Sequence, residues 1–240
     1  MPKPALRFFC FLPGHYEVHW EEKICPEQLQ VLLRLRDYVQ KAFPNAIIRH
    51  TYHILSVMHP PDSDLERCLE AFLDSESTLW KCMPTPTRSQ RTWWIPLCYA
   101  PSLAPDLPAF CASKGLEPEE FIALHTAPAY TVYFQGFRPG FYYLGGLDAR
   151  LHHPRKANPA LRLPAGTCGI GGEQTGIYPS ESPGGWWQIA HCPLSLVPEY
   201  GKEPPIQAGD HLRFIPITLA EHTEIQRNKL DLTLIQNRYG

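Results

Sequence analysis

The residues best suited to chemistry lie in one glycine-rich stretch, residues 164–179, with the sequence P-A-G-T-C-G-I-G-G-E-Q-T-G-I-Y-P. Between its glycines stand Glu173, Gln174 and Thr175, which carry a carboxylate, an amide and a hydroxyl. On an exposed loop, such groups could position water or bind a polar substrate. The alternative is that all three are solvated loop residues, as most polar residues are.

Glycines in the same stretch could bring backbone N–H groups close to an anion, because glycine adopts turns that other residues avoid. The candidates are Gly169, Gly171 and Gly172. Nucleotide-binding patterns do not fit, since Ile177 and Tyr178 stand where a P-loop needs Lys and Ser or Thr. The dinucleotide fingerprint fails too, with Gln174 in place of its last glycine. The glycines alone therefore leave two interpretations open, a functional loop or structural turns.

Two further side chains near this stretch carry useful chemistry. Arg155 lies in a basic segment, residues 152–162, and its guanidinium could hold a phosphate or carboxylate through two hydrogen bonds. A solvated loop face is the alternative. His125 ends a predicted helix, and the ordinary pKa of histidine suits acid–base work, although a lone histidine is more often structural. No metal ligands are predicted, since His15 and His19 on one strand would lie ~13 Å apart.

Composition limits the class of protein. The chain has 240 residues, 44% hydrophobic and 19% charged, which is enough apolar material for folded cores. Its 26 prolines argue against a mostly helical fold. A net charge of −2 gives no field that would attract nucleic acid or an anionic membrane. Without a signal-peptide core or a bilayer-spanning run, we expect a cytoplasmic protein with no nucleic-acid or membrane partner.

The eight cysteines are scattered without a C-x-x-C pair. In an intracellular protein, this pattern predicts reduced thiols that pack as small hydrophobic groups, and it argues against a structural zinc site.

Strand and helix patterns alternate over the first 88 residues. Strands are predicted at residues 6–12, 16–20, 46–49 and 52–58, and helices at residues 26–43 and 63–73. Pro26 suits a first helical position, and Ser63 with Glu66 forms a capping-box pattern. This order indicates an α+β sandwich with both helices on one face of a sheet. A linker rich in Pro, Thr and Ser at residues 84–90 places the domain boundary near residue 88.

The rest of the chain predicts an ordered, loop-rich β domain. Strands are predicted at residues 92–99, 130–137, 186–197 and 210–216, and short helices at residues 105–113 and 118–125. Between residues 136 and 148, glycine and proline alternate with aromatic residues, a pattern typical of tight loops held on a core. The last segment, residues 219–240, predicts a polar tail or one extra helix.

The glycine-rich motifs closely resemble those of the family of 5-oxoprolinase B subunits, also known as KipI-like proteins or allophanate hydrolase subunit 1. Three runs carry the resemblance: G-F-R-P-G-F-Y-Y-L-G-G-L-D (136–148), H-P-R-K-A-x-P (153–159) and P-A-G-T-C-G-I-G-G-E-Q-T-G-I-Y-P-S-E-S-P-G-G-W (164–186). It extends from I-P-L-C-Y (95–99) through P-D-L (105–107) to R-F-I-P (213–216), and so covers about residues 92–216.

The resemblance implies an α+β fold, with a ferredoxin-like domain over residues 1–88, a cyclophilin-like β-barrel domain over residues 89–218 and a tail over residues 219–240. It implies the B subunit of an ATP-dependent 5-oxoprolinase, which opens 5-oxoproline to L-glutamate, with Mg²⁺ accompanying the ATP. The expected partners are homologues of the A and C subunits of that enzyme, of which the latter is KipA-like. The chain alone is expected to be inactive. The alternative within the resemblance is a KipI-like regulatory module that inhibits a sensor histidine kinase.

The reaction that the resemblance implies assigns roles to the candidate residues. Activation of a lactam oxygen by ATP needs cations for phosphate oxygens and N–H donors for developing negative charge. Arg138 and Arg155 are expected to supply the cations, and the backbone of residues 169–172 the N–H donors.

The same reaction needs a group that positions water and groups that hold the substrate. Glu173 or His125 is expected to position water, and Gln174 and Thr175 are expected to hold the substrate carboxylate or amide.

Overall fold

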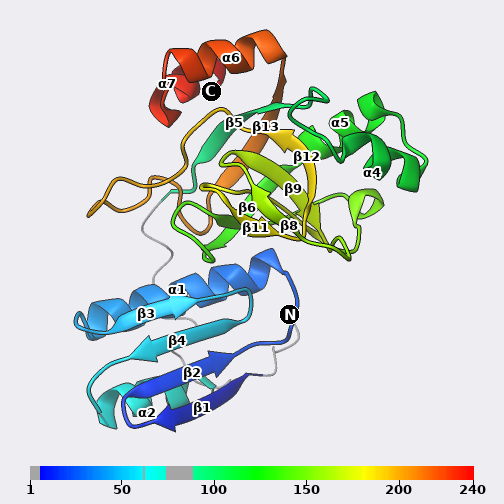
Figure 1. The fold of residues 1–240 in the computed structure, drawn as a ribbon. Coiled ribbons are helices and arrows are strands. Elements are labelled where there is room, and N and C mark those ends of the chain that lie inside the picture. Colours follow the sequence, from blue (N-terminus) through cyan, green and yellow to red (C-terminus); the bar gives the residue numbers. More distant parts are fainter. Residues whose placement is uncertain (1–5, 62, 74–88) are drawn as a thin grey trace. The chain divides into compact units, whose positions relative to one another are not determined.

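The computed structural model describes residues 6–61, 63–73 and 89–240. The chain divides into two compact units, Met1–Ser89 (unit 1) and Gln90–Gly240 (unit 2) (Figure 1). Most of the linker predicted at residues 84–90 falls outside the described residues, as does Cys82. The seven cysteines within them are free thiols. No helix in this part of the chain is long and apolar enough to cross a membrane.

Unit 1 is an antiparallel sheet with two helices. Its elements are β1 (Arg7–Leu12), β2 (His15–His19), α1 (Pro26–Ala42), β3 (Ile47–His50), β4 (Ile54–Met58) and α2 (Ser63–Leu73). The strands lie in the order β1-β2-β4-β3. Alternate residues of β2 and β4 are buried, which is the pattern of a sheet with one covered face. Figure 1 shows both helices on the same side of the strands, as the sequence predicted.

Unit 2 is built around a seven-stranded sheet. Its elements are β5 (Thr92–Cys98), α4 (Leu107–Lys114), α5 (Pro118–Thr126), β6 (Ala129–Gln135), β7 (Tyr142–Gly145), the 3₁₀ turn η1 (Ala149–Leu151), β8 (Ala160–Leu163), β9 (Thr167–Gly171), β10 (Gln174–Ile177), β11 (Ser182–Gly184), β12 (Trp187–His191), β13 (His211–Ile217), α6 (Leu219–Arg227) and α7 (Leu232–Tyr239). The strand order is β10-β9-β12-β5-β13-β6-β7, and β8 with β11 forms a separate ribbon.

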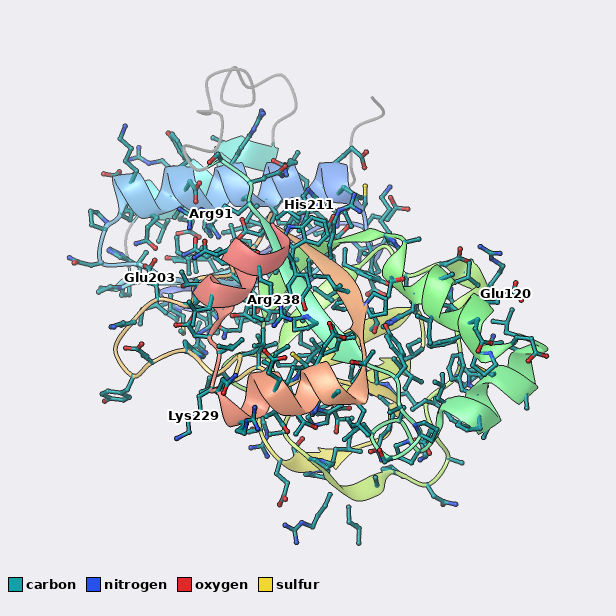
Figure 2. All side chains as sticks on the ribbon, turned by 90° about the horizontal axis from the view of Figure 1, so that it is seen from above. Arg91, Glu120, Glu203, His211, Lys229 and Arg238 are labelled. Carbon is teal, nitrogen blue, oxygen red and sulfur yellow. The ribbon has the colours of Figure 1, made fainter. Side chains whose placement is uncertain are left out.

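The large sheet forms a nearly closed barrel, because its two end strands, β10 and β7, also lie against each other. The interior is apolar, with fully buried side chains such as Ile95, Val132 and Ile189. Charged side chains such as Glu120 and Lys229 project outward (Figure 2). This separation of apolar and charged groups is the usual result of the hydrophobic effect.

The C-terminal segment corrects the sequence prediction of a tail or one extra helix, because it forms two helices, α6 and α7. Thr218 and Glu221 form a capping box at the start of α6, a Thr-x-x-Glu pattern that is visible in the sequence. In α7, the side-chain amide of Gln236 bonds to both the N–H and the carbonyl of Trp94, at 2.9 and 3.1 Å. β12 pairs with β5 only at Cys98. The amide of Gln236 therefore bonds to the backbone of β5 at a position where β12 provides no partner.

Glycines of the stretch 164–179 provide room for the indole of Trp186. A Cβ added to Gly171 would lie 2.3 Å from Cδ1 of Trp186, and one added to Gly169 would lie 3.0 Å from its Cβ. Trp186 itself is buried in a small hydrophobic cluster with Phe141, Leu163 and Tyr178. For these glycines, the structural interpretation therefore has a direct physical cause, which is the close approach of an aromatic ring.

Gly171→Ala is expected to destabilise unit 2 by about 1–3 kcal/mol, because the new methyl group overlaps the buried indole of Trp186. Gly185→Ala is the matched control, since its Cβ would meet no atom closer than 3.8 Å. Thermal unfolding of both variants measures the difference. Equal melting temperatures would contradict the packing role of Gly171.

Candidate functional site

His125 lies inside the barrel unit, where it is fully buried. Its Nδ1 is 2.7 Å from the hydroxyl of Tyr99, and its Nε2 is 2.9 Å from Oγ1 of Thr175. Thr175 donates its only hydroxyl proton to the carbonyl of Gly169 at 3.1 Å, so Nε2 must carry the proton shared with Thr175. Burial lowers the pKa of His125 to about 3. The ring is therefore neutral, and its Nδ1 accepts the hydroxyl proton of Tyr99.

This hydrogen-bond chain corrects the roles expected of His125 and Thr175. His125 has no exposed surface, and the Thr175 hydroxyl is already both donor and acceptor within the chain. Neither group can position water or hold a substrate from this place. Both act instead as positioning residues, because they tie α5 to the hairpin of β9 and β10.

The backbone of residues 169–172 also differs from the anion-binding nest that we expected. Gly169 and Gly171 lie in β9, which pairs with β10 on one side and with β12 on the other. Gly172 has φ of +68° and starts the two-residue turn into β10, where a hairpin favours glycine. Its N–H donates to the carbonyl of His153 at 2.7 Å. The glycines therefore shape a hairpin, and its tip is bound to the basic segment.

Asp106 fixes the basic segment to the barrel unit, although sequence reasoning gave it no role. Both of its carboxylate oxygens accept hydrogen bonds from Nζ of Lys156, at 2.9 and 2.8 Å. One of them also accepts the N–H of Gln188 at 2.9 Å. The pair is mostly buried, where a bidentate ion pair holds its geometry better than on an open surface. The only sequence signal for Asp106 was its place in the run P-D-L.

Aromatic packing holds the start of the same segment. The ring of His153 packs against Trp187 at 4.6 Å between centroids, and the indole N–H of Trp187 donates to the carbonyl of Pro154 at 2.9 Å. Lys156 donates its backbone N–H to Gly185 at 2.7 Å. Segment 152–156 is thus anchored on both sides of Arg155.

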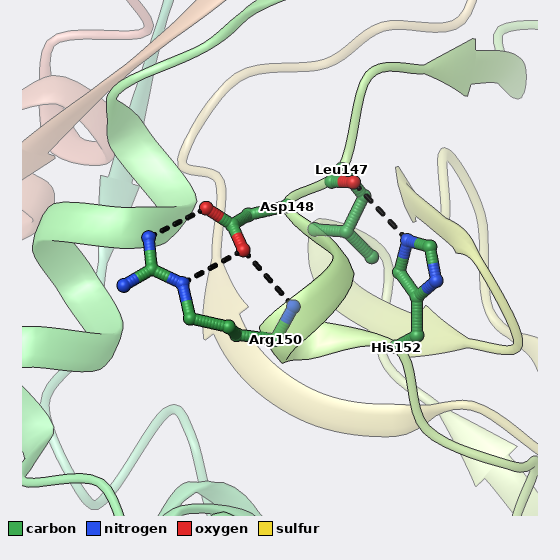
Figure 3. A network of polar contacts seen from close by, with 4 residues as sticks. All are labelled: Leu147, Asp148, Arg150 and His152. Carbon is green, nitrogen blue, oxygen red and sulfur yellow. Dashed lines mark hydrogen bonds and ion pairs between the residues drawn. The ribbon is translucent and has the colours of Figure 1, made fainter.

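The arginine just upstream of this segment is already engaged. Arg150 donates three hydrogen bonds to Asp148, at 2.9, 3.0 and 2.7 Å, and His152 bonds to the carbonyl of Leu147 (Figure 3). These bonds from Arg150 lower the pKa of Asp148 to about 2. Arg150 therefore serves to order η1 and the entry into the basic segment.

Arg155, in contrast, is exposed and has no carboxylate partner among the residues that the structure describes. Its charge lies near the hydroxyl of Tyr178, where burial raises the pKa to about 12 and Arg155 acts in the opposite direction. Arg155 is therefore an exposed guanidinium that could bind an anionic ligand.

Arg138 is linked to Tyr178 through the ring of Phe137. Its guanidinium is 5.7 Å from the centroid of the Phe137 ring, and that ring meets Tyr178 edge-on at 6.3 Å. Phe137 is 59% exposed and has φ of +64°, in a three-residue turn closed by the N–H of Arg138 and the carbonyl of Gly136 at 2.7 Å. This backbone conformation is strained for a bulky residue. It presents an aromatic ring and a cation together.

We call the group of Phe137, Arg138, Arg155 and Tyr178 the Arg138–Arg155 surface. Glu173 is exposed at the tip of the β9–β10 hairpin, next to Gly172, which pairs with His153 of the basic segment. Gln174 follows it and is half-buried. Of the predicted site residues, the arginines, Glu173 and Gln174 thus keep a place where a ligand can reach them.

The donor set suits an anion better than a metal ion. Guanidinium groups without a carboxylate partner fit phosphate oxygens, and an exposed aromatic ring fits a base. Within the described residues, no group of three or more His, Cys, Asp or Glu side chains is placed to hold a metal ion.

Residues 13–206 match the family described as carboxyltransferase domain, subdomain C and D. The chain is 47% identical over 123 residues to the 5-oxoprolinase B subunit of Escherichia coli O157:H7, covering 51% of this chain and 56% of that protein. It is 44% identical over 125 residues to the 5-oxoprolinase B subunit of Bacillus subtilis strain 168, covering 52% of each. The chain thus spans about half the length of the curated relatives it matches. These matches confirm the resemblance seen in the motifs.

Solved structures show the same architecture. The crystal structure of TTHA0988 superposes with a TM-score of 0.72 at 30% identity, covering 85% of this chain and 40% of that one. The Kluyveromyces lactis urea carboxylase superposes with a TM-score of 0.67 at 15% identity, covering 95% of this chain and 24% of that one. At this low identity, the similarity to the urea carboxylase shows a common fold and nothing more.

Acidification below neutral pH is expected to destabilise unit 2. Burial lowers the pKa of His125 to about 3 and that of His222 to about 4, whereas an unfolded histidine titrates near ~6.5. Between these values the unfolded state binds protons that the folded state excludes. The free energy of unfolding should therefore fall with decreasing pH, by up to ~1.4 kcal/mol per pH unit for each histidine. Denaturant unfolding at a series of pH values measures this slope.

His222→Gln provides the control for this slope. In the native protein, Nε2 of His222 lies 2.9 Å from Nδ1 of His191, and a glutamine amide can also donate to that nitrogen. The variant removes one titrating group, so its stability should depend less steeply on pH. An unchanged slope between about pH 4 and 6.5 would show that His222 does not contribute to the acid sensitivity.

Proposed function

The chain belongs to the family of the carboxyltransferase domain, subdomain C and D, and from that premise we propose that it is the B subunit of an ATP-dependent 5-oxoprolinase. The relatives that carry this name match about half of its length at 44–47% identity. The observation that supports a role in binding ATP is the Arg138–Arg155 surface. It offers two arginines that have no carboxylate partner among the described residues, together with the exposed ring of Phe137 and the buried ring of Tyr178.

In this proposal, unit 1 is a ferredoxin-like domain and unit 2 a cyclophilin-like domain, and the complex works in the cytoplasm. The strand order β1-β2-β4-β3 supports the first assignment, because it is that of a ferredoxin-like sheet whose last strand has moved to the N-terminus. The nearly closed seven-stranded barrel supports the second.

The reaction opens the lactam ring of 5-oxoproline to L-glutamate, and ATP supplies the phosphoryl group that activates the lactam oxygen. Arg138 and Arg155 would hold the phosphate oxygens and offset their charge. Phe137 would pack against the base, since its ring is exposed and its backbone is fixed in a tight turn. Glu173, at the hairpin tip, would position the attacking water, and Gln174 would bind the substrate beside it.

Part of the chemistry must come from other chains. The hydroxyl of Thr175 and the N–H of Gly172 are already bonded within unit 2, and His125 is buried. Groups that stabilise negative charge on the lactam oxygen are therefore expected on partner proteins, for which we propose homologues of the A and C subunits, the latter KipA-like. The same partners would complete the coordination of Mg²⁺.

Arg155→Ala and Glu173→Ala are expected to lower kcat of the assembled complex by about 10²–10³-fold each, the usual loss for one preorganised polar contact. Stability should change by less than about 0.5 kcal/mol, because both side chains are exposed. Arg162→Ala is the matched control, since Arg162 is an exposed arginine that pairs with Glu181 on the β8–β11 ribbon. Turnover and melting are measured on the same samples.

A melting loss shared by Arg155→Ala and Glu173→Ala would show that these side chains support the fold. Full turnover in either variant would remove that residue from the site, and full turnover in Arg138→Ala as well would remove the Arg138–Arg155 surface altogether.

The purified chain alone is expected to show no turnover of 5-oxoproline, because the site lacks groups that the partners supply. Activity should appear when the homologues of the A and C subunits are co-expressed and co-purify with it. Turnover by the isolated chain would contradict the shared site. Inhibition of a sensor histidine kinase by the isolated chain, without binding to the KipA-like homologue, would favour the KipI-like regulatory function instead.

A further inference from the structure

Asp106 stands at the start of helix α4, yet its carboxylate does not serve the helix. An aspartate at the N-cap position usually accepts an N–H of the first helical turn. The side chain of Asp106 makes no such capping bond. It accepts two hydrogen bonds from Nζ of Lys156 and one from the N–H of Gln188 instead. The carboxylate is thus used to hold the basic segment against the barrel, at the expense of a cap on α4.

The position of Asp106 is itself fixed. Its N–H donates to the carbonyl of Gln188 at 3.2 Å, and its carboxylate accepts the N–H of the same residue at 2.9 Å. These two bonds tie Asp106 to β12, a strand of the barrel. The side chains of Asp106 and Lys156 are 18% and 24% exposed, so water competes less for their bond than on an open surface. The ammonium group of Lys156 is therefore held at a fixed point of the barrel unit.

Helix α4 also supports the other end of the segment. Oγ of Ser113 is 3.1 Å from Nε2 of His153. His153 in turn pairs with Gly172 through two backbone hydrogen bonds of 3.0 and 2.7 Å, next to Glu173 at the tip of the hairpin. One helix thus holds the segment on both sides of Arg155.

Arg155 lies between two anchored neighbours. The carbonyl of Pro154 accepts the indole N–H of Trp187 at 2.9 Å, and the N–H of Lys156 donates to the carbonyl of Gly185 at 2.7 Å. The ammonium group of Lys156 also lies 5.8 Å from the centroid of the Trp187 ring. The backbone is fixed on each side while the side chain of Arg155 is exposed. Loss of the bond from Lys156 to Asp106 would release the backbone next to Arg155.

We propose that Asp106 is a positioning residue for anion binding, which acts through Lys156 and holds Arg155 ready to bind a phosphate group. This role rests on the proposed function, because that function assigns the phosphates of ATP to Arg155. Asp106 itself does not touch the ligand. Its contribution is to reduce the conformational freedom that Arg155 loses when the anion binds.

The sign of the effect separates positioning from simple electrostatics. Asp106→Asn removes a negative charge close to an anion site and frees the ammonium group of Lys156. By charge alone, both changes strengthen the binding of ATP. Positioning predicts the opposite, a loss of affinity by about 3–10-fold, which is the factor that ordering one long side chain costs in binding.

The test is the Kd of ATP for the assembled complex, measured by equilibrium dialysis with Mg²⁺, without 5-oxoproline and at constant ionic strength. Arg155→Ala should raise this Kd at least ~10-fold, the loss expected for a hydrogen bond to a charged group. In the Arg155→Ala background, Asp106→Asn should cause no further rise, because it acts through Arg155. Glu181→Gln is the matched control, since it breaks the ion pair with Arg162 on the β8–β11 ribbon, and it should leave the Kd unchanged.

A second variant keeps the test decisive if Asp106→Asn lowers the melting temperature. Asp106→Asn combined with Lys156→Gln leaves no unpaired charge and no change in net charge, and it should also weaken ATP binding only when Arg155 is present. An unchanged or lower Kd in both variants would overturn the positioning role and leave the proposed function intact, as would a full further loss in the Arg155→Ala background. An unchanged Kd in Arg155→Ala alone would contradict the proposed function, and the positioning role with it.

Discussion

The barrel unit depends on a hydrogen-bond chain that crosses its interior, from Tyr99 through His125 and Thr175 to the carbonyl of Gly169. Each of these polar groups would be costly to bury alone, and each is satisfied by its neighbour. The chain connects the end of β5, helix α5 and the two strands of the β9–β10 hairpin. Because burial keeps His125 neutral, the directions of donation are fixed as well. The hairpin is therefore held in one position relative to the barrel.

The fixed position of the β9–β10 hairpin also fixes the basic segment that is bound to its tip. The bridge between Gly172 and His153 carries the position of the hairpin to the basic segment, and the Asp106–Lys156 pair holds the segment from the other side. Lys156 is used in this anchoring, whereas Arg155 remains open. A rigid scaffold thus presents one arginine of the segment to solvent and uses its neighbouring cation for structure. This is the arrangement that binding an anion with a preorganised loop requires.

Aromatic packing provides the second constraint. Trp186 occupies space left by Gly169 and Gly171, and it joins Phe141 and Tyr178 in a cluster separate from the main core. Phe137 and Arg138 lie at the edge of this cluster, in a turn whose strain the packing must balance. The many glycine and aromatic residues of the family motifs are thus explained by packing, because the glycines leave room for the aromatic rings. The function that we propose uses the few side chains that this packing leaves exposed.

The sequence by itself determined the local elements of unit 1 and the family, whereas it predicted loops where unit 2 forms β7 to β11. Apolar periodicity, Pro26 and the capping-box pattern of Ser63 and Glu66 placed the strands and helices of unit 1, because these signals act over a few residues. The motifs of residues 136–186 identified the relatives, since each motif is a nearly unbroken string. For residues 219–240 the sequence analysis left a tail or one extra helix open, and the capping box of Thr218 and Glu221 was recognised only in the structure.

Only the tertiary structure decided which polar groups are buried and which are open. His125, Thr175 and Glu173 are alike in a sequence as candidates for catalysis, yet the fold encloses the first two and exposes the third. Asp106 and Lys156 are 50 residues apart, and no local pattern predicts their ion pair. The glycines suggested a binding loop until Trp186 was seen to need their space. Burial and long-range contacts depend on the fold of the whole chain. For that reason, only the tertiary structure could reduce the number of candidate site residues.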